Sequence, residues 1–283
     1  MRTRLIVGGL LTVFAAGVFY GDHVIGPPFP FLALLSWLLI LVGSYEFVKL
    51  TPKPRRPVYW VVAVGVWVVL SGHWLAGHHG LGPRGATLCN SIGFAFAVIL
   101  AFLVEMRTFH EPGESINRIA LTVLGIAYLG MLGSFFADIR IFQTDAQAGT
   151  LGMILAVFVP KGCDIGAYFT GKAIGRHKMT KVLSPNKTWE GAIGGLITAT
   201  LVALAIQWVR PIIAGGWPGA VACGLTVGLA GMLGDLAESL MKRDSGVKDA
   251  ANLIPGFGGL LDVIDAIIFA APVAYLWLMI PNS

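Results

Sequence analysis

Six ionisable side chains lie inside apolar stretches of the second half of this sequence, where a charge is costly. They are Lys161, Asp164, Asp235, Glu238, Asp262 and Asp265. A charged group in a membrane-spanning helix costs at least about 2.5 to 3.5 kcal/mol, so such a residue usually has both a function and a partner. We therefore expect the chemistry of this protein to lie after about residue 145.

The four carboxylates form two pairs with the same spacing. Asp235 and Glu238 are three residues apart near the end of one apolar stretch, and Asp262 and Asp265 are three apart near the start of the next. This spacing puts both members of a pair on one helix face, and the short connection lets the two faces meet. Carboxylates brought together repel unless a cation lies among them. Hard oxygen ligands of this kind suit Mg²⁺, so the pattern predicts a Mg²⁺ site, alone or with a second cation.

The connection between the two pairs is basic and then rich in glycine. Lys242, Arg243 and Lys248 offer phosphate oxygens one planar fork and two point charges. The run from Ile254 to Gly259 contains three glycines, which let backbone amides approach an anion closely before a helix begins. A plain interhelical turn is the other interpretation of this run. Carboxylates that hold a metal beside a basic loop are typical of a place where phosphates are bound and transferred.

A second polar segment, from Leu183 to Gly191, reads LSPNKTWEG. Ser184 with a proline behind it is typical of a helix N-cap, and Lys187 to Glu190 would then form the first turn. Ordinary helix-start chemistry is therefore one interpretation. The other is that Lys187 and Glu190 belong to a phosphate-binding loop, because three more basic residues precede them: Arg176, Lys178 and Lys181.

These residues must be carried by helices in a membrane. The chain of 283 residues is 56% hydrophobic and only 12% charged, whereas a soluble domain is about 25% charged. The apolar stretches are about 17 to 22 residues long, close to the roughly 20 that a helix needs to cross the hydrocarbon, and they lack the alternation of a barrel. We predict an all-α, polytopic integral membrane helix bundle of about nine transmembrane helices, near residues 5–20, 29–48, 58–77, 88–105, 119–137, 150–170, 191–209, 217–240 and 260–280.

The basic residues favour one orientation of this bundle. Of the 20 Lys and Arg residues, 16 fall on the side that also holds the N-terminus, and such loops usually face the cytoplasm. We expect a cytoplasmic N-terminus, residence in the cell (inner) membrane, and an active site at the cytoplasmic face. The first stretch could instead be a signal peptide, although no clean cleavage site follows Tyr20. The net charge of +5 is then a membrane feature, and we expect no nucleic-acid partner.

The polar residues are distributed unevenly along what we expect to be a single integral membrane domain, residues 1–283. We expect residues 1–145 to be a scaffold of five spans and residues 146–283 to be the catalytic half. His73, His78 and His79 are predicted to cluster in the third loop, where a solvated loop is favoured over a metal site. The sequence leaves the oligomeric state open, with a homodimer as one option.

The second half of the chain resembles a known family. The runs SLMKRDSGVKD (Ser239 to Asp249) and IPGFGGLLDVID (Ile254 to Asp265) follow GDLAES and the upstream run CDIGAYFTGKAIGRHKMTKVLSPNKTWEG. Together they resemble the signature of the phosphatidate cytidylyltransferases, also called CDP-diacylglycerol synthases. The resemblance is strong over about residues 150 to 280, and before that it rests on the number and spacing of the spans.

The resemblance implies a membrane nucleotidyltransferase of phospholipid biosynthesis, which makes CDP-diacylglycerol and pyrophosphate from CTP and phosphatidic acid at a divalent-metal site. It implies that Asp235 and Asp262 are the principal metal ligands, with Asp265 and Asp249 near them. The catalytic candidates are Asp235, Asp262, Lys187 and Lys242. The residues implied to contact phosphates or to line the same polar cavity are Ser184, Asn186, Lys187, Glu190, Lys242, Arg243, Lys248, Asp164 and Tyr168.

Two positions depart from the family pattern. Where the family has PGHGG and LDR-x-D, this chain has Phe257 and Val263 in place of the histidine and the arginine. The carboxylates remain, but one imidazole and one phosphate contact do not.

Two alternative functions stay open. One is a related CTP-dependent membrane enzyme that acts on an isoprenoid lipid. The other, from a different class, is a cation-coupled secondary transporter, which would also need buried charges and helices broken by glycine. Against transport, the ionisable residues are expected to gather at one membrane face, and we detect no inverted repeat.

Overall fold

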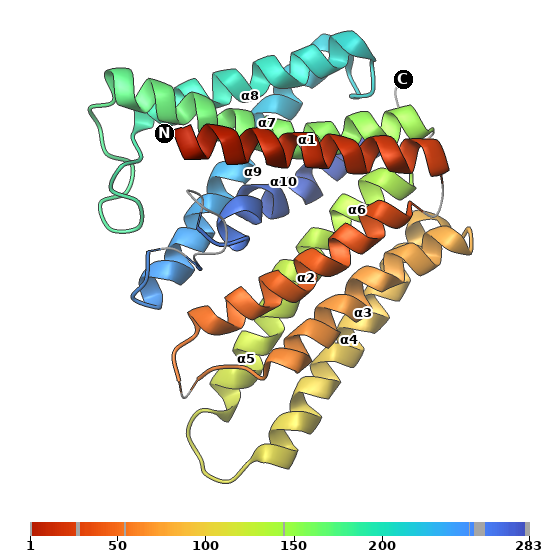
Figure 1. Ribbon diagram of the computed structural model, residues 1–283, viewed down its shortest axis with the longest axis vertical. Helices are drawn as coiled ribbons and strands as arrows, with labels where there is room; N and C mark the ends of the chain where they lie inside the picture. Colours follow the sequence, from red (N-terminus) through yellow and green to blue (C-terminus); the bar gives the residue numbers. More distant parts are fainter. Residues whose placement is uncertain are drawn as a thin grey trace. The chain divides into compact units, whose positions relative to one another are not determined.

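The computed structural model describes residues 2–26, 29–53, 55–143, 145–248, 250–251 and 258–280. It is 80% helical without strands in these residues, and a single isolated bridge joins Lys178 and Thr188 there. The all-α prediction is confirmed. The helices, labelled in Figure 1, are α1 (Arg2–Ile25), α2 (Pro30–Leu50), α3 (Tyr59–His78), α4 (Gly82–Thr108), α5 (Ser115–Gly125), the π-helix η1 (Ile126–Leu132), α6 (Gly133–Ile141), α7 (Ala146–Ile174), α8 (Trp189–Val209), α9 (Gly216–Asp244) and α10 (Leu261–Met279).

Eight helices of the described residues are long and apolar enough to cross a membrane. They correspond to the second to ninth predicted stretches, and α5, η1 and α6 together form the one span Ser115–Ile141. The first predicted stretch lies within the 24-residue helix α1. The chain is therefore a multi-pass membrane protein with 8 to 9 helices that can span the bilayer.

The chain divides into two compact units. Unit 1 holds Met1–Phe142 and Ser245–Val263, and unit 2 holds Gln143–Asp244 and Ile264–Ser283. The boundary thus falls inside α10, after its first turn. The division expected from the sequence, at residue 145, differs in one respect: the stretch Ser245–Val263, which includes Asp262, belongs with the first helices.

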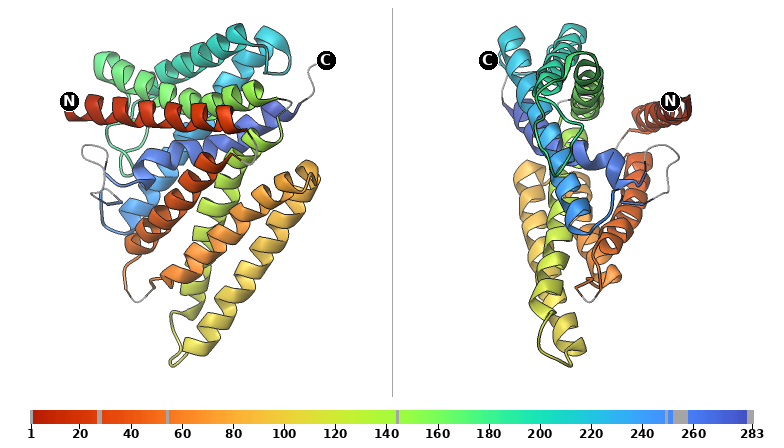
Figure 2. Two further views of the ribbon diagram at one scale, coloured as in Figure 1. Left: turned by 45° about the vertical axis from the view of Figure 1, so that its right-hand side comes forward. Right: turned by 90° about the vertical axis from the view of Figure 1, so that its left-hand side faces the viewer.

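Helix α3 is central in unit 1, where it packs against α2, α4, η1 and α6. Its residues Val62, Val66 and Val69 recur at helical spacing, and each is fully buried. Gly130 of η1 lies directly against Val66 and Val69, so this valine stripe is the face that receives the π-helix. Helices α3 and α4 run side by side in each view (Figures 1 and 2).

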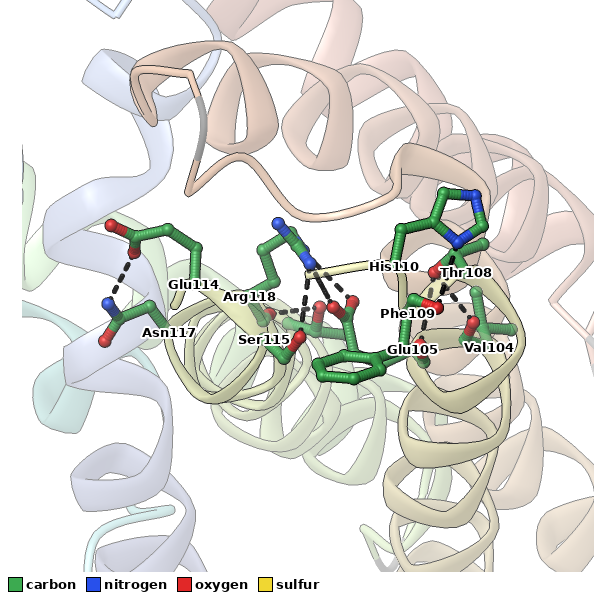
Figure 3. A network of polar contacts seen from close by, with 10 residues as sticks. Val104, Glu105, Thr108, Phe109, His110, Glu114, Ser115, Asn117 and Arg118 are labelled. Carbon is green, nitrogen blue, oxygen red and sulfur yellow. Dashed lines mark hydrogen bonds and ion pairs between the residues drawn. The ribbon is translucent and has the colours of Figure 1, made fainter. Parts of the chain in front are cut away.

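The connection between α4 and α5 is fastened by an ion pair (Figure 3). Glu105 of α4 is only 6% exposed, and Arg118 Nε of α5 donates to its two oxygens at 2.9 and 3.1 Å. The same guanidinium reaches the Ser115 hydroxyl at 3.3 Å. Asn117, in the first turn of α5, donates to Glu114 at the end of the loop at 2.6 Å. Arg118 thus gives the buried Glu105 carboxylate the charged partner that burial requires.

His73 lies inside α3, so its predicted place in the third loop was wrong. It is 2% exposed, and its Nδ1 pairs with Asp138 of α6. With Nδ1 protonated, Nε2 accepts a hydrogen bond from Asn90 Nδ2 of α4 at 2.6 Å, and Asn90 also donates to Ser134 at 3.0 Å. The span extends to His78, and polar partners from other helices make the buried imidazole tolerable.

Unit 2 is built on the pair α7 and α8, which run side by side in opposite directions (Figures 1 and 2). At Gly194 of α8 a Cβ atom would overlap the Thr170 side chain of α7, so the small residue permits the close approach that membrane helices use for packing. In the same way Gly234 of α9 lies against the backbone of Asp265 in α10. This contact brings Asp265 next to the carboxylates of α9.

The start of α7 and the end of α8 are tied together by Asp145 and Arg210. Asp145 is the N-cap of α7 and accepts from Ala148 N at 2.9 Å. Arg210 donates to its two oxygens at 2.9 and 2.6 Å. The hydrogen bonds from Arg210, followed by that from the Ala148 amide, lower the pKa of Asp145 to about 2.

Candidate active site

Three carboxylates gather in unit 2. One ligand oxygen each from Asp235 and Glu238 of α9 and from Asp265 of α10 lie within 4.8 Å of one another. Glu238 is fully buried and Asp265 is 4% exposed, whereas the Asp235 side chain is 30% exposed. The three-residue spacing does place Asp235 and Glu238 on one face, and the packing at Gly234 supplies the third carboxylate.

Each of these three carboxylates is paired with a lysine, and the three lysines come from three segments of unit 2. Lys187, in the loop before α8, lies 2.5 Å from Asp235 Oδ2. Lys242 lies one turn beyond Glu238 on α9 and 2.6 Å from its Oε2. The third, Lys161 of α7, lies 3.5 Å from Asp265 Oδ1. The site is therefore a network of alternating charge.

Lys161 also connects a fourth carboxylate to the network, since its Nζ lies 3.4 Å from Asp164 Oδ2. It lies near the middle of α7, about 20 Å along the axis from either end. Lys161 gathers with the other ionisable residues of unit 2, and the expectation that they lie at one membrane face stays a prediction. The spacing of three between Lys161 and Asp164 is the signal in the sequence that could have predicted their contact.

The helix after the second polar segment does not begin at Ser184. Helix α8 begins at Trp189, and its N-cap is Thr188, whose hydroxyl accepts from Gly191 N at 3.1 Å. Ser184 begins a turn instead, because its carbonyl accepts from Lys187 N at 3.1 Å. The N-cap assignment of Ser184 was wrong, and the turn sets Lys187 just ahead of the helix.

Glu190, in the first turn of α8, binds the end of the preceding loop. Its carboxylate accepts from the backbone amides of Arg176 and His177 at 3.1 and 3.2 Å, and the His177 ring lies 2.5 Å away. The contact fixes both ends of the segment that carries Lys187. Two other implied phosphate contacts, Asn186 and Arg243, are exposed, and Arg243 Nε donates to Leu183 O at 3.4 Å.

The remaining predicted residues belong to unit 1. Asp262, in the first turn of α10, accepts through Oδ2 from Gly259 N at 2.7 Å and from Ala250 N at 3.1 Å. Lys248 is exposed. Asp249 and Phe257 lie outside the described residues, so the predicted role of Asp249 as a metal ligand stays a prediction.

The three carboxylates of unit 2 fit a hard divalent cation. Mg²⁺ takes oxygen ligands, usually one or two carboxylates with water and substrate phosphates completing the shell. Three carboxylate oxygens within 4.8 Å of one another offer such a set. Glu238 belongs to it, as the spacing of the acidic pairs indicated, although the family resemblance did not imply it as a ligand. The three lysines supply the positive charge that phosphate oxygens need.

The comparisons with known proteins point to one family. The family model described as "Cytidylyltransferase family" matches residues 2–280. The chain is 34% identical to the phosphatidate cytidylyltransferase of a Synechocystis species over 223 residues, covering 69% of this chain and 74% of that protein. It is 33% identical to the protein of that name from Brucella suis over 252 residues, covering 86% and 83%. With the Staphylococcus aureus protein of that name it shares 33% identity over 277 residues, covering 97% and 92%.

Proposed function

Because the chain belongs to the cytidylyltransferase family, we propose that it is a phosphatidate cytidylyltransferase, a nucleotidyltransferase that makes CDP-diacylglycerol. The observation that carries the proposal is the cluster of Asp235, Glu238 and Asp265, in which each carboxylate has a lysine partner. The relatives that bear this name match the chain over most of its length. Neither the isoprenoid-lipid enzyme nor the transporter has comparable support.

The reaction joins two phosphate compounds. A phosphate oxygen of phosphatidic acid attacks the α-phosphorus of CTP, the bond from that phosphorus to the β-phosphate bridging oxygen breaks, and the electron pair leaves with pyrophosphate. With a second pKa near 6, the phosphate monoester is largely dianionic at about pH 7. No side chain has to remove a proton from it, which agrees with a cluster made of carboxylates and lysines.

The residues of the cluster divide the remaining work, which is to hold two anionic reactants in line. Asp235, Glu238 and Asp265 would hold Mg²⁺, which when bound neutralises charge on the transferring and leaving phosphates. Lys187 and Lys242 would bind phosphate oxygens of the nucleotide, and a metal held by the carboxylates would supply the positive charge that these carboxylates otherwise receive from the lysines.

We place the reaction at the cytoplasmic face of the inner membrane, with CTP arriving from water and phosphatidic acid from the leaflet. The basis is the excess of Lys and Arg on the side that holds Lys187 and Lys242. In a cysteine-free background, single cysteines at Arg84 and Lys181 should react with an impermeant reagent from opposite sides. Labelling of both from outside would exclude this topology.

The direct test of the function is turnover by the purified protein. With CTP, phosphatidic acid and Mg²⁺ we expect CDP-diacylglycerol and pyrophosphate in equal amounts, and neither when the metal is chelated. Asp235→Asn should abolish turnover. Asp145→Asn is the matched control, because it removes a carboxylate of unit 2 that does not belong to the cluster, and its folded fraction should remain active. A product formed only with an isoprenoid lipid, or ion-coupled uptake without any product, would refute the proposal.

A further inference from the structure

Glu46 is a buried acid in the part of the chain that the sequence marks as scaffold. It lies near the end of α2, a helix otherwise rich in leucine and valine, and none of its surface is exposed. An acidic residue inside a membrane helix is costly and requires partners. Those partners are more than 200 residues away in the sequence.

The partners of Glu46 are the backbone amides of Leu260, just before α10, and of Leu261, its first residue. Leu260 N donates to Glu46 Oε1 at 2.8 Å, and Leu261 N donates to Oε2 at 2.8 Å. The first amides of a helix have no acceptor within the helix, and the N-terminal end of the helix dipole favours a carboxylate. Glu46 therefore acts as an N-cap that one helix supplies to another.

Asp262 holds the same turn from the other side. Its Oδ2 accepts from Gly259 N at 2.7 Å and from Ala250 N at 3.1 Å. Three consecutive amides, those of residues 259 to 261, are thus bound by two carboxylates of unit 1. The sequence predicted that amides of the run from Ile254 to Gly259 approach an anion. For the Gly259 amide this anion is a carboxylate of the protein itself.

The two glycines at this turn are explained by the same contacts. Gly258 has φ 104°, a conformation that favours glycine, and a Cβ atom there would lie 2.8 Å from Asp262 Oδ2. At Gly259 a Cβ atom would lie 2.7 Å from Glu46 Oε2. Both positions therefore exclude larger residues, because the carboxylates pack directly on the backbone.

We propose that Glu46 is a positioning residue for the reaction, which fixes the turn from Gly258 to Leu261 and through it the carboxylate of Asp262. Both Glu46 oxygens are engaged by amides and the side chain is inaccessible, so it acts through Asp262 and not on the substrate. The inference rests on the proposed function and on the role of Asp262 as a metal ligand, which the family resemblance implies, and not on the carboxylate cluster of unit 2.

The test compares Glu46→Gln and Glu46→Asp with Ser44→Ala in the full-length protein. Glutamine keeps the shape, but its NH₂ group would face an amide N–H, so one of the two hydrogen bonds is lost. Aspartate keeps the charge and should recover part of the effect. Ser44 is the matched control, because it is fully buried on the same helix and its hydroxyl has no hydrogen-bond partner among the described residues.

We expect Glu46→Gln to act on the turn and on the metal together. Hydrogen exchange at the amides of Leu260 and Leu261 should become faster, while exchange in α3 and α4 stays unchanged. Loss of such a supporting contact typically weakens metal affinity about 10- to 100-fold. We therefore expect the Mg²⁺ concentration for half-maximal activity to rise about 10- to 100-fold. The Mn²⁺ dissociation constant, measured without substrate, should rise by the same factor. Ser44→Ala should behave as wild type.

Gly259→Ala provides a second route if the Glu46 variants fold poorly, because it displaces the carboxylate without removing it. The inference is overturned if Glu46→Gln and Gly259→Ala keep wild-type metal dependence, or if exchange rises equally throughout unit 1. Asp262→Asn separates the two proposals. If Asp262→Asn weakens metal binding and Glu46→Gln does not, only the role of Glu46 is refuted. If Asp262→Asn binds the metal as tightly as wild type, the metal role of Asp262 is refuted and the inference with it.

Discussion

Lys161 offers a quantitative test of the charge network, because its removal leaves Asp265 without its lysine. The Lys161 Nζ and Asp265 Oδ1 atoms are 3.5 Å apart. At that distance two unit charges attract by about 5 kcal/mol for an effective dielectric constant of about 20. Breaking a buried pair by removing one partner costs about 3 to 5 kcal/mol. Since the Lys161 side chain is still 29% exposed, we expect the lower end, about 3 kcal/mol, for Lys161→Met.

The assay is equilibrium unfolding in detergent with EDTA present. Lys161→Met and Asp265→Asn should each destabilise, and the double variant should lose less than the sum of the two, because the second change removes the charge that the first left unpaired. Lys172→Met is the matched control, since it removes an exposed lysine of the same helix and should change stability by less than about 0.5 kcal/mol.

The effect of Mg²⁺ on stability distinguishes a metal site from a simple ion pair. Mg²⁺ can replace the missing positive charge, so adding it should stabilise Lys161→Met more than wild type. Strictly additive single variants, or a Lys161→Met protein as stable as Lys172→Met in EDTA, would show that the lysine and the carboxylate are not coupled and would refute the reasoning.

Three further predictions concern positions outside this pair. Replacing Phe257 by His should change turnover by no more than about tenfold, or roughly 1.4 kcal/mol, because in the proposed site the metal and the lysines would already stabilise the charge. A gain of several orders of magnitude would instead mean that the protein is a degenerate relative with another natural role. His73→Leu should destabilise by about 2 to 4 kcal/mol in detergent unfolding, since it removes the partner of Asp138 and the acceptor of one Asn90 N–H group. The kcat of the folded protein should be unchanged, and a neutral effect on stability would contradict the buried network. Arg210 lowers the pKa of Asp145 from 3.8 to about 2. The contribution of this carboxylate to stability is therefore complete above the ordinary pKa and is lost as the pH falls toward 2. Asp145→Asn should flatten the dependence of stability on pH across that window, and an unchanged dependence would count against the ion pair of Asp145 with Arg210.

The spans and the acidic pairs could be predicted from the sequence because each depends on a local rule. The thickness of the hydrocarbon fixes the length of an apolar helix, and a spacing of three fixes that Asp235 and Glu238 share a face. The helix start at Thr188 could not be predicted in the same way. Ser184 and Thr188 are both acceptable N-caps, and contacts of the folded loop, such as that of Glu190 with His177, distinguish them.

The partners of the charged residues depended on packing that the sequence does not show. Lys161 and Asp265 are 104 positions apart in the chain, and the close approach at Gly234 sets where Asp265 lies. Glu46 was overlooked for the same reason, because its partner amides are separated from it by 214 and 215 positions. The signal for it in the sequence is a lone acid in an apolar span.

The central claim is that the carboxylates of α9 and α10 form the metal centre of CDP-diacylglycerol synthesis. Its most direct test measures Mn²⁺ binding by paramagnetic resonance and lipid product formation on the same preparations of wild type and Asp265→Asn. We predict that wild type binds the ion and converts CTP and phosphatidic acid to CDP-diacylglycerol, and that Asp265→Asn, folded in detergent, loses both together. An Asp265→Asn protein that makes the product at the wild-type rate with an unchanged metal requirement would contradict the account.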